Sequence, residues 1–394
     1  MKMEDPIRRA AVALEAATHV LIGAGAGMSA DSGLSTYADA ASVGGLSYAE
    51  LCQPTALLEH PAAAYGFWAT SLSAYRAAVP HEGYAVLQRL CASKPPNQSC
   101  VYTSNVDGLF RRFPALASRL HEIHGCVEEW ACGSSLGFAR DDGTGQLRSR
   151  GGVFEAHNSQ VADRARQANG GGVGTGTGGG NGALPWDPAC AAFRTSPPRG
   201  RCVAEWQARC DERLSSPAAG PLPPPTPLGA AALVEEEEEA SEDGVAWGAD
   251  AVPRCPLCSS PLRPSVVMFG DTDVLLLERQ AAAASAYQSW EEQMEVQLAA
   301  SPPRTRMVVL EIGCGLTVPS VRRECEDVVR DVLRRGGCAS LIRINPEAQV
   351  ASCTDGASPP AEQDDEPLPS EHVVLIRDGA LRGLLRIEEA LGAY

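Results

Sequence analysis

The chain has 394 residues, enough for two average domains, and a hydrophobic content of 44% is ample for buried cores. A formal net charge of −16 argues against direct binding of nucleic acid through a basic face. The sequence contains no run of 18 apolar residues and no signal-peptide pattern. We therefore expect a soluble intracellular protein, cytoplasmic by default with the nucleus as the alternative, in which the 14 cysteines are thiols and metal ligands rather than disulfides.

The first predicted element is an apolar strand from Val20 that runs directly into a glycine-rich turn, in the segment VLIGAGAGMSADSGLSTY. Gly25, Gly27 and Ala30 fit the pattern G-x-G-x-x-G/A, in which backbone N–H groups approach a pyrophosphate at a helix N-terminus. A tight turn without a ligand is the alternative. A dehydrogenase would next show a strand that ends in an acidic residue about 20 residues on. Residues 38–60 instead indicate a loop and a short helix, which disfavours hydride transfer.

Further apolar strands follow along the chain, and most have polar or glycine residues at their ends. They are Val101–Thr103 before Ser104, Asn105, Val106 and Asp107; Val266–Asp271; Met307–Ile312 before Gly313, Cys314 and Gly315; Leu341–Ile344 before Asn345, Pro346 and Glu347; and His372–Ile376. Recurring strand-turn-helix units predict a parallel sheet that is buried on both faces and binds ligands at the carboxyl ends of its strands.

The middle of the chain differs in composition. Residues 141–182 contain 13 of the 39 glycines, and residues 235–239 are five consecutive glutamates. Such a segment buries too little apolar surface to offset its ordering entropy, so we expect a largely disordered insertion over about residues 136–250. An ordered island is expected around Leu184–Cys210, where Trp186 and Trp206 pack. After it, Cys255-Pro256-Leu257-Cys258 is half of a tetrahedral thiolate zinc site.

Taken together and in this order, these motifs and the Ile123-His124-Gly125 segment resemble the sirtuins, a family of NAD-dependent protein-lysine deacylases. The resemblance covers roughly residues 8–132 and 252–350. It implies an α/β fold with a Rossmann-like NAD-binding domain formed by residues 1–131 and 259–394. A smaller zinc-ribbon or helical module would occupy residues 132–258 and carry the insertion.

The resemblance also implies an activity, the transfer of an acyl group from a protein lysine to ADP-ribose with release of nicotinamide. His124 would be the general base that accepts a ribose proton, whereas His121 would have no catalytic role. Asn105 and Asp107 would order the nicotinamide ribose and carboxamide. The other NAD-binding positions would be Gly25, Ala26, Gly27, Ser29, Tyr37, Ser104, Val106, Gly313, Cys314, Gly315, Asn345, Pro346 and Glu347. Val267, Phe269 and Gly270 would hold the acyl-lysine peptide by β-augmentation.

For zinc, the resemblance places Cys132 with Cys255 and Cys258, but Ser135 stands where the family has its fourth cysteine. Cys126, Cys190, Cys202 and Cys210 are the alternatives for that ligand, and loss of zinc is the other possibility. The chain also departs from the family in the cofactor loop, because Ala38 follows Tyr37 where an arginine is expected. A divergent member of the family is therefore expected.

Two further functions stay open at this stage. The same glycosidic chemistry would serve an ADP-ribosyltransferase or an NAD hydrolase, because only the nucleophile changes. A non-catalytic NAD-responsive binding module is the second alternative. The presence of His124, Asn105 and Asp107 disfavours that module, because a sensor needs no general base. The sequence indicates no membrane partner, and it does not determine the oligomeric state.

Overall fold

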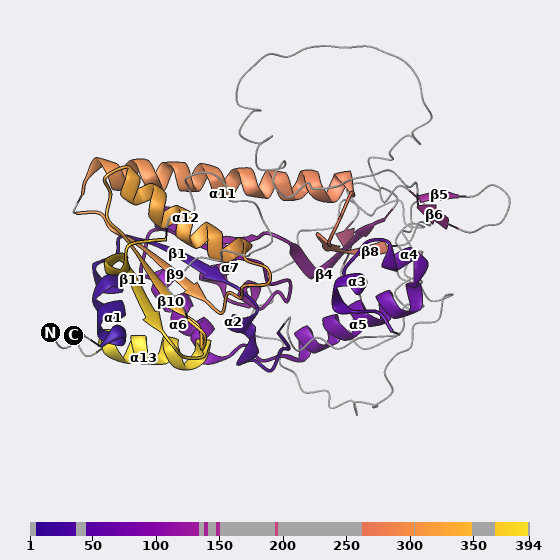
Figure 1. Ribbon diagram of the computed structural model, residues 1–394, viewed down its shortest axis with the longest axis horizontal. Coiled ribbons are helices and arrows are strands. Elements are labelled where there is room, and N and C mark those ends of the chain that lie inside the picture. Colours follow the sequence, from indigo (N-terminus) through magenta and orange to yellow (C-terminus); the bar gives the residue numbers. More distant parts are fainter. Residues whose placement is uncertain are drawn as a thin grey trace, which may run out of the picture.

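A six-stranded sheet in which every strand pair is parallel forms the centre of the molecule (Figure 1). Its strands are β1 (His19–Ala24), β2 (Ser99–Thr103), β3 (Leu120–Glu122), β9 (Met307–Ile312), β10 (Ala339–Ile344) and β11 (Val373–Ile376). They lie in the order β3-β2-β1-β9-β10-β11, so the strand order reverses between β1 and β9. This is the doubly wound order of dinucleotide-binding folds, and it confirms the expected Rossmann-like α/β class.

This computed structural model describes residues 5–36, 45–133, 138–140, 147–149, 194–195, 262–302, 304–348 and 367–392. Most of the expected insertion at 136–250, with Trp186 and Trp206, lies outside these residues. Within it the structure describes three short strands: β5 (Phe138–Arg140), β6 (Leu147–Ser149) and β7 (Arg194–Thr195).

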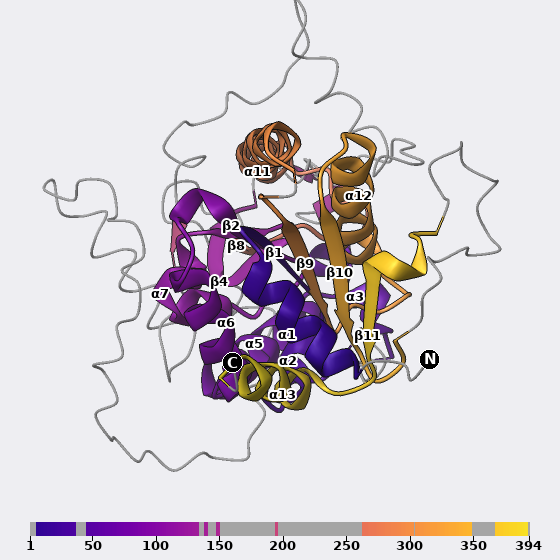
Figure 2. The same cartoon turned by 90° about the vertical axis from the view of Figure 1, so that its left-hand side faces the viewer.

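Helices cover both faces of the sheet (Figure 2). Side chains of a strand alternate between its two sides, so each strand contributes apolar residues to a core on either face. Val20 and Ile22 of β1 belong to the core under α1 (Pro6–Ala16), α6 (Glu82–Ala92) and α13 (Ala380–Gly392). Leu21 belongs to the opposite core, under α11 (Val274–Ala300) and α12 (Ser320–Arg334). No described helix is both long enough and apolar enough to span a bilayer.

A third core lies beyond the carboxyl ends of the parallel strands. It joins α3 (Tyr48–Leu51), α4 (Ala56–Glu59) and α5 (Pro61–Ala77) to a small antiparallel sheet of β7, β4 (Gly125–Cys132) and β8 (Leu262–Val266). Trp130 is fully buried there and stacks on Tyr65, with 6.2 Å between the ring centroids. The domain limits at residues 132 and 258 stay a prediction, and this core draws mainly on residues 48–72, 127–132 and 262–268.

One strand prediction is wrong in both extent and orientation. The apolar run Val266–Asp271 was expected to be a strand, but β8 ends at Val266 and pairs antiparallel with β4. Gly270 has a φ of +67°, and the Asp271 carboxylate accepts hydrogen bonds from its own loop at the N–H groups of Met268 and Asp273. These local bonds turn the chain, so residues 267–270 form a loop rather than an extension of the strand.

Buried ion pairs join the sheet to α12. Arg343 of β10 lies opposite Glu311 of β9 and donates to both of its carboxylate oxygens, from Nε at 2.8 Å and from a terminal nitrogen at 2.7 Å. The same guanidinium donates to Glu326 of α12 at 2.5 Å. All three side chains are at least 95% buried. Because an unpaired charge at such depth costs several kcal/mol, this cluster specifies how α12 sits on β9 and β10.

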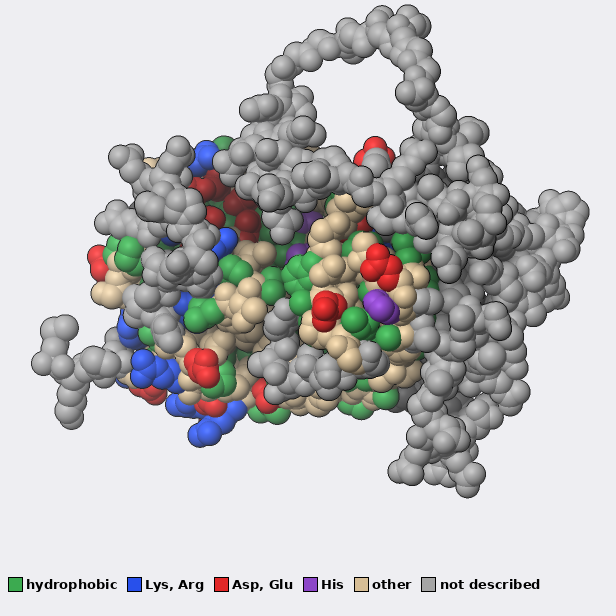
Figure 3. All heavy atoms as spheres, turned by 45° about the vertical axis from the view of Figure 1, so that its right-hand side comes forward, with side chains coloured by type: hydrophobic (Ala, Val, Ile, Leu, Met, Phe, Trp, Pro, Cys, Tyr) green, Lys and Arg blue, Asp and Glu red, His purple; other side chains and the backbone are tan. Residues whose placement is uncertain are grey.

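Carboxylates also gather where α11 packs against α12, on a surface where Figure 3 shows a concentration of acidic side chains. Burial raises the pKa of Glu291 to about 8, and the negative charges of Glu324 and Glu295 add to the shift. Burial and the neighbouring carboxylates therefore keep Glu291 largely protonated near pH 7.

Candidate functional site

Two loops touch through their backbones at the point where the strand order reverses. The first follows β1 and leads into α2 (Gly27–Ala30), and the second follows β9. A Cβ atom on Gly25 would lie 2.7 Å from the carbonyl oxygen of Gly313, and one on Gly27 would lie 2.7 Å from the Gly313 Cα. Gly313 itself has a φ of +62°. The close contact between the two loops therefore requires glycine at these positions, independently of any ligand.

Polar side chains from the β2 loop reach the glycine turn and bind it. The Asn105 amide donates to the Gly25 carbonyl oxygen and to Ser29 Oγ, at 3.0 Å each. Ser29 Oγ donates to Asp107 at 2.5 Å, and the other Asp107 oxygen accepts from the Leu109 N–H at 2.8 Å. No described residue donates to Asn105 Oδ1, which leaves this oxygen available for a ligand hydroxyl.

Tyr84 of α6 is a member of this network that sequence reasoning missed. Its hydroxyl lies 3.1 Å from Ser29 Oγ, and its ring is fully buried against Phe110 and Phe113. Burial raises the pKa of Tyr84, and the nearby Asp107 charge raises it further, so the phenol stays protonated. No local motif could have indicated this contact, because Tyr84 is an ordinary apolar-face residue of its helix.

His124 lies beside Asn105 at the carboxyl edge of the sheet. Thr103 and Glu122 are register partners in β2 and β3, and Asn105 and His124 each come two residues later. His124 is half-buried, and burial lowers the pKa of its imidazole while a hydrogen bond to the Ile123 backbone opposes the shift. The ring is therefore neutral near pH 7, the state that a general base needs.

His121 lies in an aromatic environment, and its lack of a catalytic role stays a prediction. Its ring stacks on Tyr287 of α11 with centroids 5.3 Å apart and contacts Tyr102 at the same distance. Desolvation lowers its pKa to about 4. A histidine that is neutral and enclosed by aromatic rings serves as a core residue.

The loops after β9 and β10 are tied together in a similar way. The Asn345 amide donates to the Cys314 carbonyl oxygen at 3.0 Å, and its Oδ1 accepts from the Glu347 N–H. Cys314 is buried, whereas Gly315, Pro346 and Glu347 are exposed. The predicted adenosine-side residues thus share one surface, but the Cys314 thiol points into the protein, where burial raises its pKa.

The expected peptide-binding residues lie next to His124. The Val267 N–H donates to the His124 carbonyl oxygen at 2.9 Å, and the Phe269 N–H donates to the Cys52 carbonyl oxygen at 2.9 Å. Phe269 is 45% exposed. Both N–H groups already donate hydrogen bonds within the protein. A peptide strand added here would therefore pair with the carbonyl oxygens of Val267 and Phe269 and with the backbone of Gly270.

An ion pair that the sequence did not reveal holds this loop in place. Arg263 of β8 donates to both oxygens of Asp271, at 2.9 and 2.5 Å, and to the Val266 carbonyl. Both side chains are 1% exposed. A bidentate pair of this kind fixes the direction in which the chain leaves β8.

Several predicted residues cannot be placed. Tyr37, Ala38, Cys255, Cys258, Cys190, Cys202 and Cys210 lie outside the described residues. Of the two remaining cysteines, Cys132 ends β4 opposite Leu262, whereas Cys126 lies opposite Ser265, three residues along β8, because β4 is irregular between Cys126 and Trp130. Three steps of a strand correspond to about 10 Å. Within the residues that are described, no group of three metal-ligating side chains gathers.

Comparison with known proteins agrees with this geometry. The model of the Sir2 family matches residues 25–151, the stretch that contains the glycine turn, Asn105, Asp107 and His124. This stretch of the chain is similar to the Sir2 family. NAD-dependent protein deacylase 2 of Pseudomonas aeruginosa is 33% identical over 159 residues, which are 38% of this chain and 61% of that protein. The chain thus matches about six-tenths of the length of this curated relative.

Two solved structures are matched at low sequence identity. One, from work on the structural basis of sirtuin substrate affinity, is 15% identical with a TM-score of 0.48 and covers 99% of each chain. A second, a complex of a Sir2 homologue with NAD, is 15% identical with a TM-score of 0.47 and covers 99% of this chain and 95% of the other.

The contact between the loops makes a direct prediction about two glycines. We expect Gly27→Ala to lower the free energy of unfolding by about 1–3 kcal/mol, because its Cβ would collide with backbone rather than with a flexible side chain. Gly315→Ala is the matched control, since nothing lies within 4 Å of a Cβ there, and it should change stability by less than about 0.5 kcal/mol. Urea unfolding of both variants measures this, and equal stabilities would refute the contact.

Proposed function

We propose that this protein is an NAD-dependent protein-lysine deacylase that transfers the acyl group to ADP-ribose and releases nicotinamide. The observation that carries the proposal is the convergence of Ser29, Asn105 and Asp107 in one hydrogen-bonded network beside His124. The match to the Sir2 family model and the similarity to the deacylase named above support the assignment.

The residues at the carboxyl edge fit a dinucleotide. The strand order reverses there, which is where doubly wound sheets bind such ligands, and the turn after β1 exposes Ala26 at the start of α2. In our proposal the glycine turn holds the pyrophosphate, Asn105 Oδ1 accepts from a ribose hydroxyl, and the surface around Gly315 and Asn345 holds the adenosine. Bound NAD supplies a ribose carbon that becomes electrophilic when nicotinamide leaves.

His124 would act on the ribose from the adjoining strand end. Its neutral imidazole can accept a hydroxyl proton, and its backbone carbonyl fixes the loop at Val267, which lies on the proposed substrate side. Asp107 is fully engaged by Ser29 and Leu109, so its first role is to position Ser29 and the turn. Burial raises the pKa of Asp107, an effect that the Ser29 hydrogen bond opposes.

Product analysis tests the proposal and separates it from the other NAD-consuming activities. Full-length protein is incubated with NAD and an acetyl-lysine peptide, and the products are identified by mass spectrometry. We expect deacetylated peptide and O-acetyl-ADP-ribose in equal amounts. ADP-ribosylated protein would instead indicate a transferase, and free ADP-ribose without deacetylation would indicate a hydrolase. Either result would overturn the deacylase assignment.

The role of His124 has its own test. We expect His124→Ala to lower turnover by about 10²–10⁴-fold, the usual contribution of a general base, while NAD affinity stays within a few-fold. His121→Phe is the matched control, because it keeps an aromatic ring against Tyr287 and should retain turnover. Calorimetric titration with NAD and the same product assay give both quantities. Near-normal turnover in His124→Ala would remove this residue from the mechanism.

We also propose that a structural zinc ion stabilises the third core, with Cys132, Cys255 and Cys258 as ligands. Cys132 is the register partner of Leu262, the first residue of β8, and Cys258 comes only four residues before Leu262. Four residues span at most about 14 Å, so Cys258 is near enough along the chain to reach Cys132, which supports the proposed pairing. When bound, such an ion cross-links the two strands and adds folding free energy.

Metal analysis of protein purified without chelators should return about one zinc per chain. Cys132→Ser should lose the metal and destabilise the protein, because thiolate ligation contributes to folding. Cys338→Ser, at a half-exposed cysteine before β10, should keep it. Zinc-free wild-type protein of full stability would contradict the proposal.

A further inference from the structure

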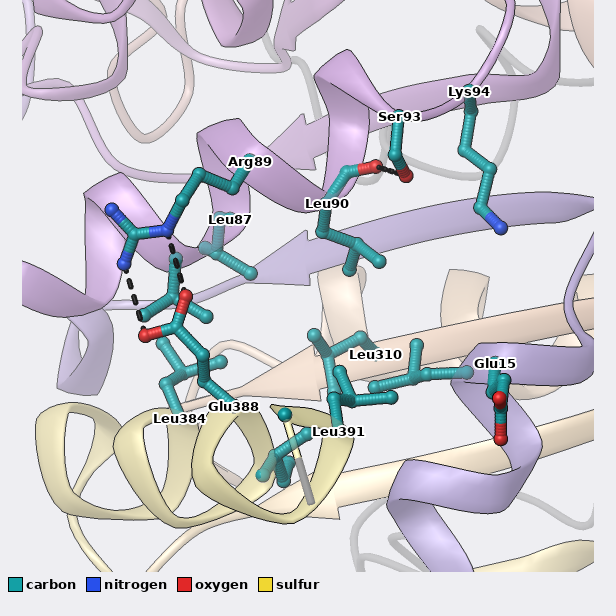
Figure 4. A pocket seen from close by; sticks show the side chains of 14 residues that line it. Glu15, Leu87, Arg89, Leu90, Ser93, Lys94, Leu310, Leu384, Glu388 and Leu391 are labelled. Carbon is teal, nitrogen blue, oxygen red and sulfur yellow. Dashed lines mark hydrogen bonds and ion pairs between the residues drawn. The ribbon is translucent and has the colours of Figure 1, made fainter. Parts of the chain in front are cut away.

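A cavity of about 390 Å³ lies between α1, α6 and α13, away from the candidate site (Figure 4). α1 and α6 end shortly before β1 and β2 begin, so their last turns lie at the amino ends of the strands. The last turn of α13 returns to the same end, because this helix follows β11. The cavity and the site at the carboxyl ends of the strands therefore occupy opposite ends of the sheet.

The walls of the cavity are aliphatic. Three helices and one strand provide them, with Leu14 from α1, Leu87 and Leu90 from α6, Leu310 from β9, and Leu384 and Leu391 from α13. No lining residue is aromatic. Its volume lies in the range of small-molecule sites, about 300–1,000 Å³. Walls of this kind favour a flexible alkyl chain over a flat ring, because no π-face is offered for stacking.

Two cationic side chains stand at the rim, and they differ in what they bind. The Arg89 guanidinium forms a two-point ion pair with Glu388, with distances of 2.7 and 3.0 Å, and also contacts Glu82. Lys94 Nζ donates to the Ala17 carbonyl oxygen at 2.5 Å, and no described carboxylate forms an ion pair with it. Burial lowers the pKa of Lys94, as expected for an ammonium group without an anion.

The identity of Lys94 adds to this observation. The chain contains 33 lysine and arginine residues, of which only Lys2 and Lys94 are lysines. A lysine at the rim offers a compact charge with three donors, of which the Ala17 carbonyl uses one. The two remaining N–H groups can donate hydrogen bonds to one small anion.

We propose that the cavity binds a linear aliphatic monocarboxylate of medium chain length, with its tail among the leucines and its carboxylate on the Lys94 ammonium. A single available cation matches a single negative charge, and the rim carboxylates of Glu15 and Glu388 disfavour a polyanion. This site uses no residue of the proposed deacylase machinery, and its test does not depend on NAD or on turnover.

Octanoate is the probe, and NMR of the lysine side chains tests whether it binds next to Lys94. Protein labelled with ¹³C only in lysine gives side-chain Cε signals from two residues, and Lys2→Gln assigns them. We expect octanoate to shift the Lys94 signal and to raise the Lys94 pKa by about one unit, because a bound carboxylate favours the charged amine. His19 and Glu15 are the other titratable groups nearby, and neither gives a lysine Cε signal. An unmoved Lys94 signal at millimolar octanoate would overturn the proposal.

Calorimetry measures separately how much the carboxylate and the alkyl chain contribute to binding. The wild type should bind octanoate about tenfold more tightly than the neutral octanamide, and Lys94→Gln should bind the two alike. Butyrate should bind far more weakly, because it leaves most of the leucine surface unfilled. Equal affinity of the wild type for octanoate and octanamide would exclude the role of Lys94.

A second variant locates the tail. Leu391 is half-buried at the end of α13, so Leu391→Trp should fill the cavity while leaving the fold intact, as judged by thermal unfolding. We expect this variant to lose octanoate binding. Wild-type affinity in folded Leu391→Trp would place the ligand elsewhere and refute the site.

Discussion

The backbone contact between the loops after β1 and β9 is the constraint on which the candidate site depends. Three glycines allow it, because a Cβ on Gly25, Gly27 or Gly313 would lie within 2.7 Å of backbone atoms of the facing loop. The contact occurs where the strand order reverses, so it sets the shape of the edge at which a dinucleotide would bind. Any side chain there would force the two loops apart and open the edge.

Side-chain amides extend this constraint to the outer strands. Asn105 joins the β2 loop to Gly25, and Asn345 joins the β10 loop to Cys314. Glu311 of β9 lies two residues before Gly313, and Arg343 of β10 lies two residues before Asn345. These two side chains form an ion pair in the buried interior. The loops after β9 and β10 are therefore positioned by an ion pair in the strands that precede them, and amide hydrogen bonds link them to neighbouring loops. A site arranged in this way before any ligand arrives needs little reorganisation during a reaction.

The two histidines near β3 show how three residues of chain separate a core residue from the proposed general base. His121 lies within the strand, and its side chain faces α11 and the ring of Tyr287. His124 follows the strand, at the level of Asn105, where the chain turns into β4. Burial lowers the pKa of both imidazoles, so the position of each ring, rather than its charge, distinguishes the roles that we propose for them.

The sequence by itself determined the parallel sheet, the glycine turn and the positions of Asn105, Asp107 and His124 at strand ends. It could do so because buried parallel strands read as continuous apolar runs, as in Met307–Ile312, which the structure reproduces. The tertiary structure decided the rest: Gly313 as the reason for the motif glycines, Tyr84 in the Ser29 network, and the turn that ends β8 at Val266. These features arise from contacts between residues far apart in the chain or from one buried ion pair. Local periodicity carries no record of such contacts, because it reports only which face of an element is buried and not what lies against it.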